Sequence, residues 1–467
     1  ALVFGLLHGF GFAGALHEVG LPGHAIPLAL FLFNVGVEAG QLLFVAAVQL
    51  RRDRDGIAAL EVFEVAKPWR EADADVGEAI DFLEYYGRRM LELAAPRRMD
   101  RAPGESNTLE YRPRGVAAVV APWNFPLAIL CGMSAAALVT GNSVVLKPAE
   151  QAPLCAWRWV EALRAAGAPP DLVQFLPGRG EVAGAALVSH PGVQLVAFTG
   201  SLATGLHIVE QAARARKGRS AIVRVIAELG GKNAIVIDSD ADLDEAVAGV
   251  VRSAFGFAGQ KCSACSRAIV VDSVHDVFVR RLVEATRALQ LGPPADPRTD
   301  VPPLVDAEQQ RSVRQWRETA ASEGTLVYRG EDPGGGYYVA PAIVAGIEPV
   351  HRVAQEEIFG PVLSVMRASD FEHALQLANS TRFALTGAVY SRSPAHLERA
   401  RRAFEVGNLY LNRPCTGALV ERQPFGGFAL SGMGSKAGGP DSLLQFLDAR
   451  TVTENTLRRG FTRELLS

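Results

Sequence analysis

The stretch "GVAAVVAPWNFPLAILCGMSAAALVTGNSVVLKPAE", residues 115–150, decides the fold class of this chain. It begins with a short apolar run and ends with a second one, "SVVLKP", and a longer stretch of helical character separates the two. The runs "LVAFTG" at 195–200 and "NAIVID" at 233–238 repeat the pattern further along. Because strands that alternate with helices usually pair in parallel, the sequence predicts a parallel α/β sheet.

The bulk composition limits the classes of protein that this chain can represent. The chain has 467 residues, 49% of them hydrophobic and 21% charged, with a formal net charge of −3. At roughly 100–200 residues per domain, we expect two or three domains around a large core. A near-neutral charge gives no electrostatic reason to expect a nucleic-acid partner. Five cysteines are too few for a disulfide framework in a chain of this size, which favours a reduced, cytoplasmic compartment.

Residues 1–52 differ in kind from the rest of the chain. The stretch from 25 to 50, "AIPLALFLFNVGVEAGQLLFVAAVQL", carries only four strongly polar side chains, and arginines follow it. Since about 20 apolar residues span a bilayer, this stretch predicts a tilted transmembrane helix with a cytoplasmic flank; a buried core helix is the alternative. The stretch "GLLHGFGFA" at 5–13 resembles HupE/UreJ-type nickel-accessory membrane proteins. We therefore expect a membrane-like fragment at 1–52, joined to a second protein.

The stretch "GFAGQKCSACSR", residues 256–267, places two cysteines three positions apart after a glycine-rich approach. Cys262 stands beside Lys261, and a nearby cation favours the thiolate, which is the reactive form of the side chain. Cys265 has the character of a small packed hydrophobe. A zinc site needs about four ligands, and the nine histidines are scattered, so we expect no metal. From these residues alone, a redox pair and a packed thiol stay open beside a nucleophile.

Two further motifs carry groups that could assist a nucleophile. In "APWNFP", residues 121–126, prolines restrict the backbone on both sides of Asn124, and a rigid amide is a neutral donor for an oxyanion. In "AELGGKN", residues 227–233, Glu228 closes an apolar strand beside two glycines, and a desolvated carboxylate can act as a general base. Taken alone, the first motif can be a plain turn and the second a partnered structural acid.

Two more motifs lie where an α/β sheet binds ligands. "VVLKPAE" places Lys147 and Glu150 just past a buried strand, at the carboxyl end where ligands of open sheets bind. "VAFTGSLATG", residues 196–205, reads as a strand, a turn and the start of a helix, and the N–H groups of a helix N-terminus can bind phosphate. A surface ion pair and a structural turn are the respective alternatives.

The order of the motifs along the chain resembles that of the aldehyde dehydrogenase superfamily. The matching stretches are "PWNFP", "LKPAE", "FTGS", "ELGGKN", "GQKCSA", "EEIFGPV" and "PFGG", and the similarity runs from about Ala58 to Arg459. The resemblance implies a Rossmann-like NAD-binding domain at 58–229, a catalytic domain at 230–415 and a C-terminal return at 416–467. It also implies an oligomerisation β-hairpin with a strand near 107–118, and hence a homo-oligomer. The family usually has more sequence before this point, so we expect an N-terminally truncated cofactor domain.

The resemblance also assigns roles to single residues. Cys262 corresponds to the nucleophile, Glu228 to the general base and Asn124 to the oxyanion donor. The positions that correspond to NAD contacts are Trp123, Lys147, Glu150, Gly180, Gly200, Ser201, Gly205, Glu357 and Phe359. A carboxylate at Glu150 favours NAD over NADP, because it would repel a 2′-phosphate.

Within the superfamily, the chain resembles the branch that oxidises L-glutamate γ-semialdehyde. The stretches that carry this likeness are "QKCSACSR", "LNRPCTGALVERQPFGG" and "SGMGSKAGGPDSLLQFLDARTVTENTLRRGF". The likeness implies that the backbone amides of Gly417 and Ala418 hold the α-carboxylate, that Ser263 adds a hydroxyl, and that Phe125 and Phe425 flank the aliphatic chain. The alternatives are another semialdehyde, such as succinate semialdehyde, and a membrane nickel-accessory fragment joined to an inactive dehydrogenase domain.

Overall fold

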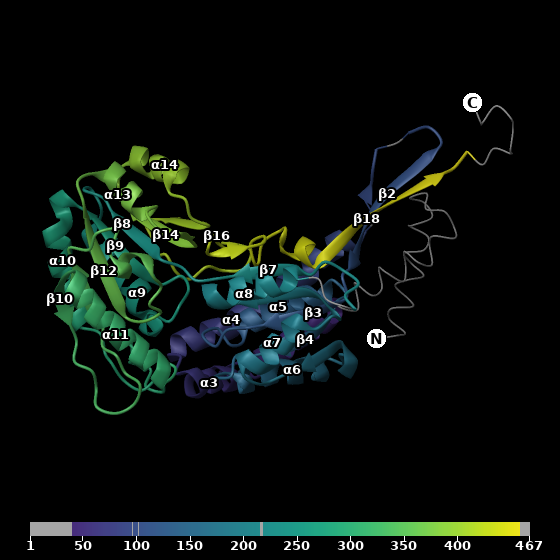
Figure 1. Ribbon diagram of the computed structural model, residues 1–467, viewed down its shortest axis with the longest axis horizontal. Helices are drawn as coiled ribbons and strands as arrows, with labels where there is room; N and C mark the ends of the chain where they lie inside the picture. The colour runs from purple at the N-terminus through teal and green to yellow at the C-terminus, as the bar shows by residue number, and fades with distance from the viewer. Residues whose placement is uncertain (1–39, 96, 101, 215–217, 458–467) are drawn as a thin grey trace.

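The computed structural model describes residues 40–95, 97–100, 102–214 and 218–457, which form two α/β lobes and a projecting sheet (Figure 1). In the first lobe the described strands lie in the order β17-β7-β6-β3-β4-β5. Neighbouring strands from β7 to β5 are parallel, whereas β17 is antiparallel to β7. The bounds of these strands are β17 (Gly432–Met433), β7 (Arg224–Glu228), β6 (Val193–Thr199), β3 (Val116–Val120), β4 (Ser143–Lys147) and β5 (Val173–Phe175). The predicted parallel α/β sheet is confirmed.

Helices cover both faces of this sheet, which explains why its strands are apolar throughout. Along β3, Ala117 and Val119 belong to one buried cluster and Ala118 to another, because alternate side chains of a strand point to opposite faces. The first cluster also holds side chains from α4 (Trp69–Ala94), α5 (Ala128–Val139) and α6 (Pro153–Ala165). The second holds side chains from α7 (Ala185–Ser189) and α8 (Leu202–Ala213).

The second lobe is built around a sheet with the described order β10-β11-β12-β9-β8-β14-β15. Its pairs are parallel except for β10 against β11. The bounds of its strands are β10 (Thr325–Arg329), β11 (Ala342–Ala345), β12 (Val362–Ala368), β9 (Cys265–Val271), β8 (Asn233–Ile237), β14 (Thr386–Tyr390) and β15 (Asn408–Leu411). The accompanying helices are α9 (Leu243–Phe255), α10 (Asp272–Arg287), α11 (Ala307–Glu323), α12 (Arg352–Gln355), α13 (Phe371–Ala378) and α14 (Pro394–Ala403). The predicted domain boundaries stay a prediction.

A small sheet projects away from the body of the molecule (Figure 1). Its strands lie in the order β1-β2-β18, with bounds β1 (Arg97–Arg98), β2 (Glu105–Pro113) and β18 (Leu447–Asn455). β2 and β18 pair antiparallel along their whole length, although more than 300 residues of chain separate them. Two strands that meet at such a separation tie the end of the chain back to the first lobe.

Residues 40–52 are helical and pack on the first lobe. Leu43, Ala46, Ala47 and Leu50 are buried in the same cluster as the apolar side chains of α4 and α5. The predicted membrane span of 25–50 lies partly outside the described residues, and its described end covers the protein core. Among the described residues, no helix is both long and apolar enough to cross a membrane. For residues 40–50, therefore, the alternative reading as a core helix is the correct one.

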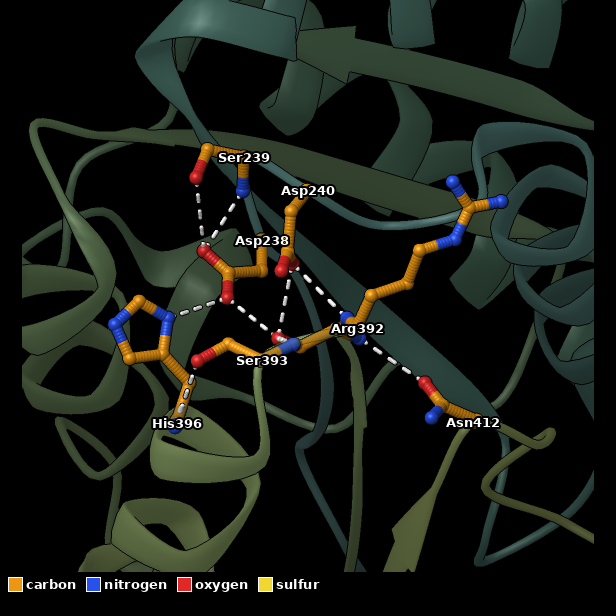
Figure 2. Close-up of polar contacts among 8 residues, drawn as sticks. Asp238, Ser239, Asp240, Arg392, Ser393, His396 and Asn412 are labelled. Carbon is orange, nitrogen blue, oxygen red and sulfur yellow. Dashed lines mark hydrogen bonds and ion pairs between the residues drawn. The ribbon is translucent and has the colours of Figure 1, made fainter.

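The carboxyl ends of β8 and β14 are joined by a polar network (Figure 2). Asp238 accepts a hydrogen bond from Ser391 Oγ at 2.7 Å and contacts His396 Nδ1 at 2.6 Å. Asp240 accepts hydrogen bonds from Ser391 Oγ and from the Arg392 backbone N–H, each at 3.0 Å. The network follows the last residue of each strand, whereas Cys262 lies near their first residues. It therefore fixes the register of the second sheet at the edge away from the cysteine.

Candidate functional site

A cavity of about 140 Å³ lies among residues of both lobes. Cys262, from the second lobe, and Glu228, from the end of β7 in the first, both line it. The same lining contains every residue expected to contact the substrate: Ser263, Gly417, Ala418, Phe125 and Phe425. Seven of the predicted site residues, which are spread along the chain from Phe125 to Phe425, therefore meet at one place.

Cys262 lies in the segment between η3 (Gly256–Gly259) and β9. A side chain at Gly259 would place its Cβ 2.6 Å from the carbonyl oxygen of Gly360, and the φ of 71° at Gly259 also favours glycine. From the opposite side, Asn233 Nδ2 donates a hydrogen bond to the Cys262 carbonyl oxygen at 2.7 Å. These contacts fix the backbone of the cysteine against the start of β8.

The Cys262 thiol holds its proton at neutral pH. Burial raises its pKa to about 12, and the carboxyl groups of Glu357 and Glu228 add to the shift. Lys261, the cation expected to favour the thiolate, instead forms an ion pair with Glu71 at 3.0 Å. That expectation is wrong, because adjacency in sequence does not decide where a long side chain points. A base must therefore take the thiol proton before the sulfur can attack.

Glu228 is an enclosed acid of the cavity. Burial raises its pKa to about 8, while the Lys436 ammonium and the backbone N–H of Gly427 act in the opposite direction. The chain passes very close to it, since a Cβ at Gly426 would lie 2.7 Å from Glu228 Oε1. The carboxyl group can thus exchange a proton near neutral pH, which suits a general base.

Asn124 is buried beside the cysteine segment. Its side-chain amide donates to the carbonyl oxygen of Gln260 at 3.0 Å, two residues before Cys262. An amide nitrogen carries two hydrogens, so the second N–H is free to meet an oxygen bound at Cys262. The structure therefore places Asn124 beside the segment that carries Cys262, although Asn124 is not among the residues that line the cavity with Cys262 and Glu228.

Two of the predicted cofactor residues, Lys147 and Glu150, form a pair at the end of β4. Lys147 Nζ donates to the Pro148 carbonyl oxygen at 2.7 Å and to Glu150 Oε2 at 3.3 Å. Lys147 is buried, whereas the Glu150 carboxylate is partly exposed. Gly180 begins the π-helix η2 (Gly180–Gly184), whose last residue approaches the Lys147 side chain. This group offers a carboxylate and an ammonium to a ribose hydroxyl.

A second group of predicted cofactor residues lies between the lobes. The rings of Trp123 and Phe359 meet edge to face with centroids 5.6 Å apart. Glu357 accepts a hydrogen bond from the Gly231 backbone N–H at 3.0 Å, and burial raises the pKa of its carboxyl group to about 7. A Cβ at Gly230 would lie 2.1 Å from Glu357 Oε2, so the motif glycines make room for this acid.

The remaining cofactor positions shape the start of α8. Ser201 is its N-cap and accepts a hydrogen bond from the Thr204 backbone N–H. The Gly200 backbone N–H donates to the Glu228 carbonyl oxygen at 3.1 Å. A Cβ at Gly205 would lie 2.3 Å from the Leu229 side chain, so glycine lets the helix pack closely on the segment that follows β7. The N–H groups of a helix N-terminus can donate to the phosphates of a dinucleotide, and carboxylates can accept from its ribose hydroxyls.

The loop at Gly417 and Ala418 presents backbone amides to the cavity. Arg413 Nη2 donates to the carbonyl oxygens of Thr416 and Gly417, at 3.4 and 3.2 Å. Within the described part of the chain, neither the Gly417 nor the Ala418 N–H donates a hydrogen bond. Adjacent amides without an acceptor form a receptor for a carboxylate.

Glu78 also lines the cavity, although it belongs to none of the sequence motifs. It lies on α4, one helical turn before Phe82 and two before Tyr86, which line the cavity as well. Burial and the nearby Asp75 raise the pKa of its carboxyl group to about 8. An acid on the apolar face of an amphipathic helix is the signal that could have identified Glu78.

No cluster of potential metal ligands occurs among the described residues.

The comparison with protein families defines the class. The aldehyde dehydrogenase family matches residues 37–452, so the chain belongs to this family. The match begins well before Ala58, where the sequence motifs placed its start, and it includes the helix at 40–52. The HupE / UreJ protein family matches residues 1–52, as predicted.

Individual relatives agree with one another. The chain is 50% identical over 414 residues to 1-pyrroline-5-carboxylate dehydrogenase of Geobacillus thermodenitrificans, covering 88% of this chain and 80% of that one. It resembles the NAD-bound structure of 1-pyrroline-5-carboxylate dehydrogenase from Thermus with a TM-score of 0.89 and 47% identity, over 90% and 82% of the two chains. It also resembles proline utilization A from Bdellovibrio bacteriovorus (TM-score 0.90, 51% identity), covering 91% of this chain but 44% of that larger one.

Proposed function

We propose that this chain oxidises L-glutamate γ-semialdehyde, the open form of 1-pyrroline-5-carboxylate, to L-glutamate with NAD, the second step of proline degradation. The observation that carries the proposal is the cavity in which Cys262, Glu228 and the amide loop at Gly417 and Ala418 meet. The 50% identity to a 1-pyrroline-5-carboxylate dehydrogenase supports the same substrate.

In the proposed reaction, the Cys262 thiol passes its proton through Glu228 to water, and the sulfur attacks the aldehyde carbon. The Asn124 amide and the Cys262 backbone N–H donate to the oxyanion that forms. Bound NAD would supply the hydride acceptor, and loss of a hydride from this carbon would leave a thioester on the Cys262 sulfur. Glu228 then takes a proton from a water molecule, which attacks the thioester and releases the carboxylate. The sulfur leaves as thiolate and recovers a proton, so the enzyme returns to its starting state.

The polar groups around the cavity support an α-amino acid substrate. The two amides of the loop suit its α-carboxylate, and the Glu78 carboxyl group suits its α-ammonium. The rings of Phe125 and Phe425 would flank the aliphatic part. Succinate semialdehyde, the alternative substrate, has no ammonium group and would leave the Glu78 carboxyl group without a partner.

For NAD, we propose the residues that fit its parts. Lys147 and Glu150 would hold the adenosine ribose, and Gly180, Trp123 and the start of α8 at Gly200, Ser201 and Gly205 would surround the adenine and pyrophosphate. Glu357 would accept from the nicotinamide ribose, with Phe359 next to the ring.

The test is NADH formation, followed by absorbance, with glutamate semialdehyde and succinate semialdehyde as competing substrates. We expect a higher kcat/KM for glutamate semialdehyde and no turnover by Cys262→Ala. Turnover that survives this substitution would refute the nucleophile, and a preference for succinate semialdehyde would refute the substrate.

Two partner assignments belong to the same proposal. The projecting sheet of β2 and β18 suits pairing with a second copy of the chain, which light scattering after size-exclusion chromatography would detect. Membrane attachment through residues 1–50 has no support in the described helix at 40–52 and stays a prediction for the residues before it. Recovery of the chain without detergent would count against such attachment.

A further inference from the structure

A group of buried charges lies directly behind Asn124. Lys67, Asp75 and Glu61 are each at most 1% exposed. Lys67 Nζ lies 2.9 Å from Asp75 Oδ1 and 3.8 Å from Glu61 Oε2. Burying such charges is costly, and an apolar replacement of similar volume is often at least as stable. The stability of the fold alone therefore gives no reason for this ion pair.

The contacts of the pair lie on one functional segment. Lys67 Nζ donates to the backbone carbonyl oxygen of Asn124 at 2.9 Å and lies 3.9 Å from the centroid of the Phe125 ring. Asp75 Oδ2 accepts from the backbone N–H groups of Leu127 and Ala128, at 3.2 and 3.1 Å. The pair thus holds both ends of the segment from 124 to 128, in which the amide and the ring of the site lie.

We propose that Lys67 and Asp75 are positioning residues for aldehyde oxidation, fixing the Asn124 amide beside Cys262 and the Phe125 ring at the cavity wall. Lys67 donates a hydrogen bond to the Asn124 backbone carbonyl oxygen, and the Asn124 side chain donates one to the Gln260 carbonyl oxygen on the cysteine segment. Neither member of the pair is among the residues that line the cavity. Their effect therefore passes through Asn124 and Phe125.

This role predicts which kinetic constant changes. A donor to an oxyanion acts mainly in the transition state, and a displacement of about 1 Å can cost on the order of 100-fold in rate. NAD binding involves other residues, so its affinity should stay the same. The prediction rests on the proposed function, because it concerns the oxyanion of that reaction.

The experiment replaces Lys67 and Asp75 together, because Lys67→Met alone leaves Asp75 buried without its partner and could prevent folding. Glu61 is left in place, because burial already raises the pKa of its carboxyl group well above the usual value. In the double variant Lys67→Met/Asp75→Asn, the asparagine oxygen can still accept from Leu127 and Ala128. The matched control is Arg317→Met/Asp332→Asn, which removes a largely buried pair, bonded at 2.7 and 2.9 Å, from outside the site. The thermal unfolding midpoint and the activity of this control together show how much activity is lost through destabilisation alone.

We expect kcat to fall roughly 10- to 100-fold in the Lys67/Asp75 variant and less than about twofold in the control, with NAD dissociation constants unchanged. In an Asn124→Ala background, the same double substitution should lower kcat by less than about threefold further, because residues that act through one another are not additive. Equal losses in both backgrounds, or a wild-type kcat, would overturn the proposal.

The wild-type chain assayed in parallel separates this proposal from the proposed function. If the wild type does not oxidise glutamate semialdehyde, the proposed function fails. Hydrolysis of p-nitrophenyl acetate then measures the effect of the Lys67/Asp75 substitution. That reaction needs the cysteine and the oxyanion donor but no aldehyde or NAD. The same pattern of non-additive loss supports the positioning role there, and its absence refutes it.

Discussion

Truncating one buried leucine in the helix at 40–52 should destabilise the dehydrogenase, although this helix belongs to the segment that matches a membrane protein family. Leu43 and Leu50 are each 1% exposed and lie in the cluster that contains α4 and α5. Removing a fully buried leucine side chain costs about 2–5 kcal/mol, from lost burial and the cavity left behind. Total stabilities are of the order of 5–15 kcal/mol, so Leu43→Ala alone should have a large effect.

The two leucines also allow a test of additivity. Seven residues of helix separate them by about 10 Å along the axis, far enough for their effects to add. The double variant should then lose about 4–10 kcal/mol and be largely unfolded at 37 °C. Phe44, which is 60% exposed in the same helix, supplies the control, and Phe44→Ala should stay within about 0.5 kcal/mol of the wild type.

The assay is urea unfolding followed by circular dichroism, with NADH formation measured at each concentration. We expect the midpoint of Leu43→Ala to move to lower urea and that of Phe44→Ala to stay in place. If Leu43→Ala and Phe44→Ala unfold alike, residues 40–52 do not pack on the core.

Three further outcomes follow from the site. The pKa of Glu228 is about 8, so the rate of thioester hydrolysis should rise with pH through 8 and be about tenfold lower at pH 7 than at its plateau. In stopped-flow measurements over this range, Glu228→Gln should hydrolyse the thioester slowly and at a rate that does not depend on pH. Glu78→Gln should raise KM for glutamate semialdehyde by roughly 10-fold and leave that for succinate semialdehyde within about twofold, and an equal change in both would argue against an ammonium partner. Gly426→Ala puts a methyl group against Glu228, and we expect kcat to fall at least about tenfold with unchanged NAD affinity by calorimetry.

The motif residues of the site could be predicted because each belongs to a local pattern with its own geometry. Glu228 ends an apolar strand, and Asn124 follows one, so the parallel sheet brings both to the same edge. Lys67 and Asp75 could not be predicted in the same way. Their partners at 124, 127 and 128 lie more than 50 residues along the chain, and only tertiary packing decides those contacts.

Apolar composition at 25–50 illustrates a second limit of sequence reasoning. A continuous apolar run satisfies the requirements of a bilayer span and of a buried helix equally well, because both remove the side chains from water. For residues 40–50 the deciding factor is the presence of a complementary surface on α4 and α5, which no local window contains. Lys261 illustrates the same point for charge, since its partner Glu71 stands 190 positions earlier in the chain.

The electrostatics of the cavity explain how a thiol with a pKa of about 12 can serve as a nucleophile. Burial disfavours the charged forms of three cavity acids and raises their pKa values. The pKa is about 8 for Glu78, about 8 for Glu228 and about 7 for Glu357. Each negative charge among them opposes formation of the Cys262 thiolate. The α-ammonium of the proposed substrate and the positive charge of oxidised nicotinamide would offset these acids, and added positive charge lowers the pKa of a thiol. Occupancy of the site by both cations should therefore lower the pKa of Cys262 and increase the reactivity of its sulfur.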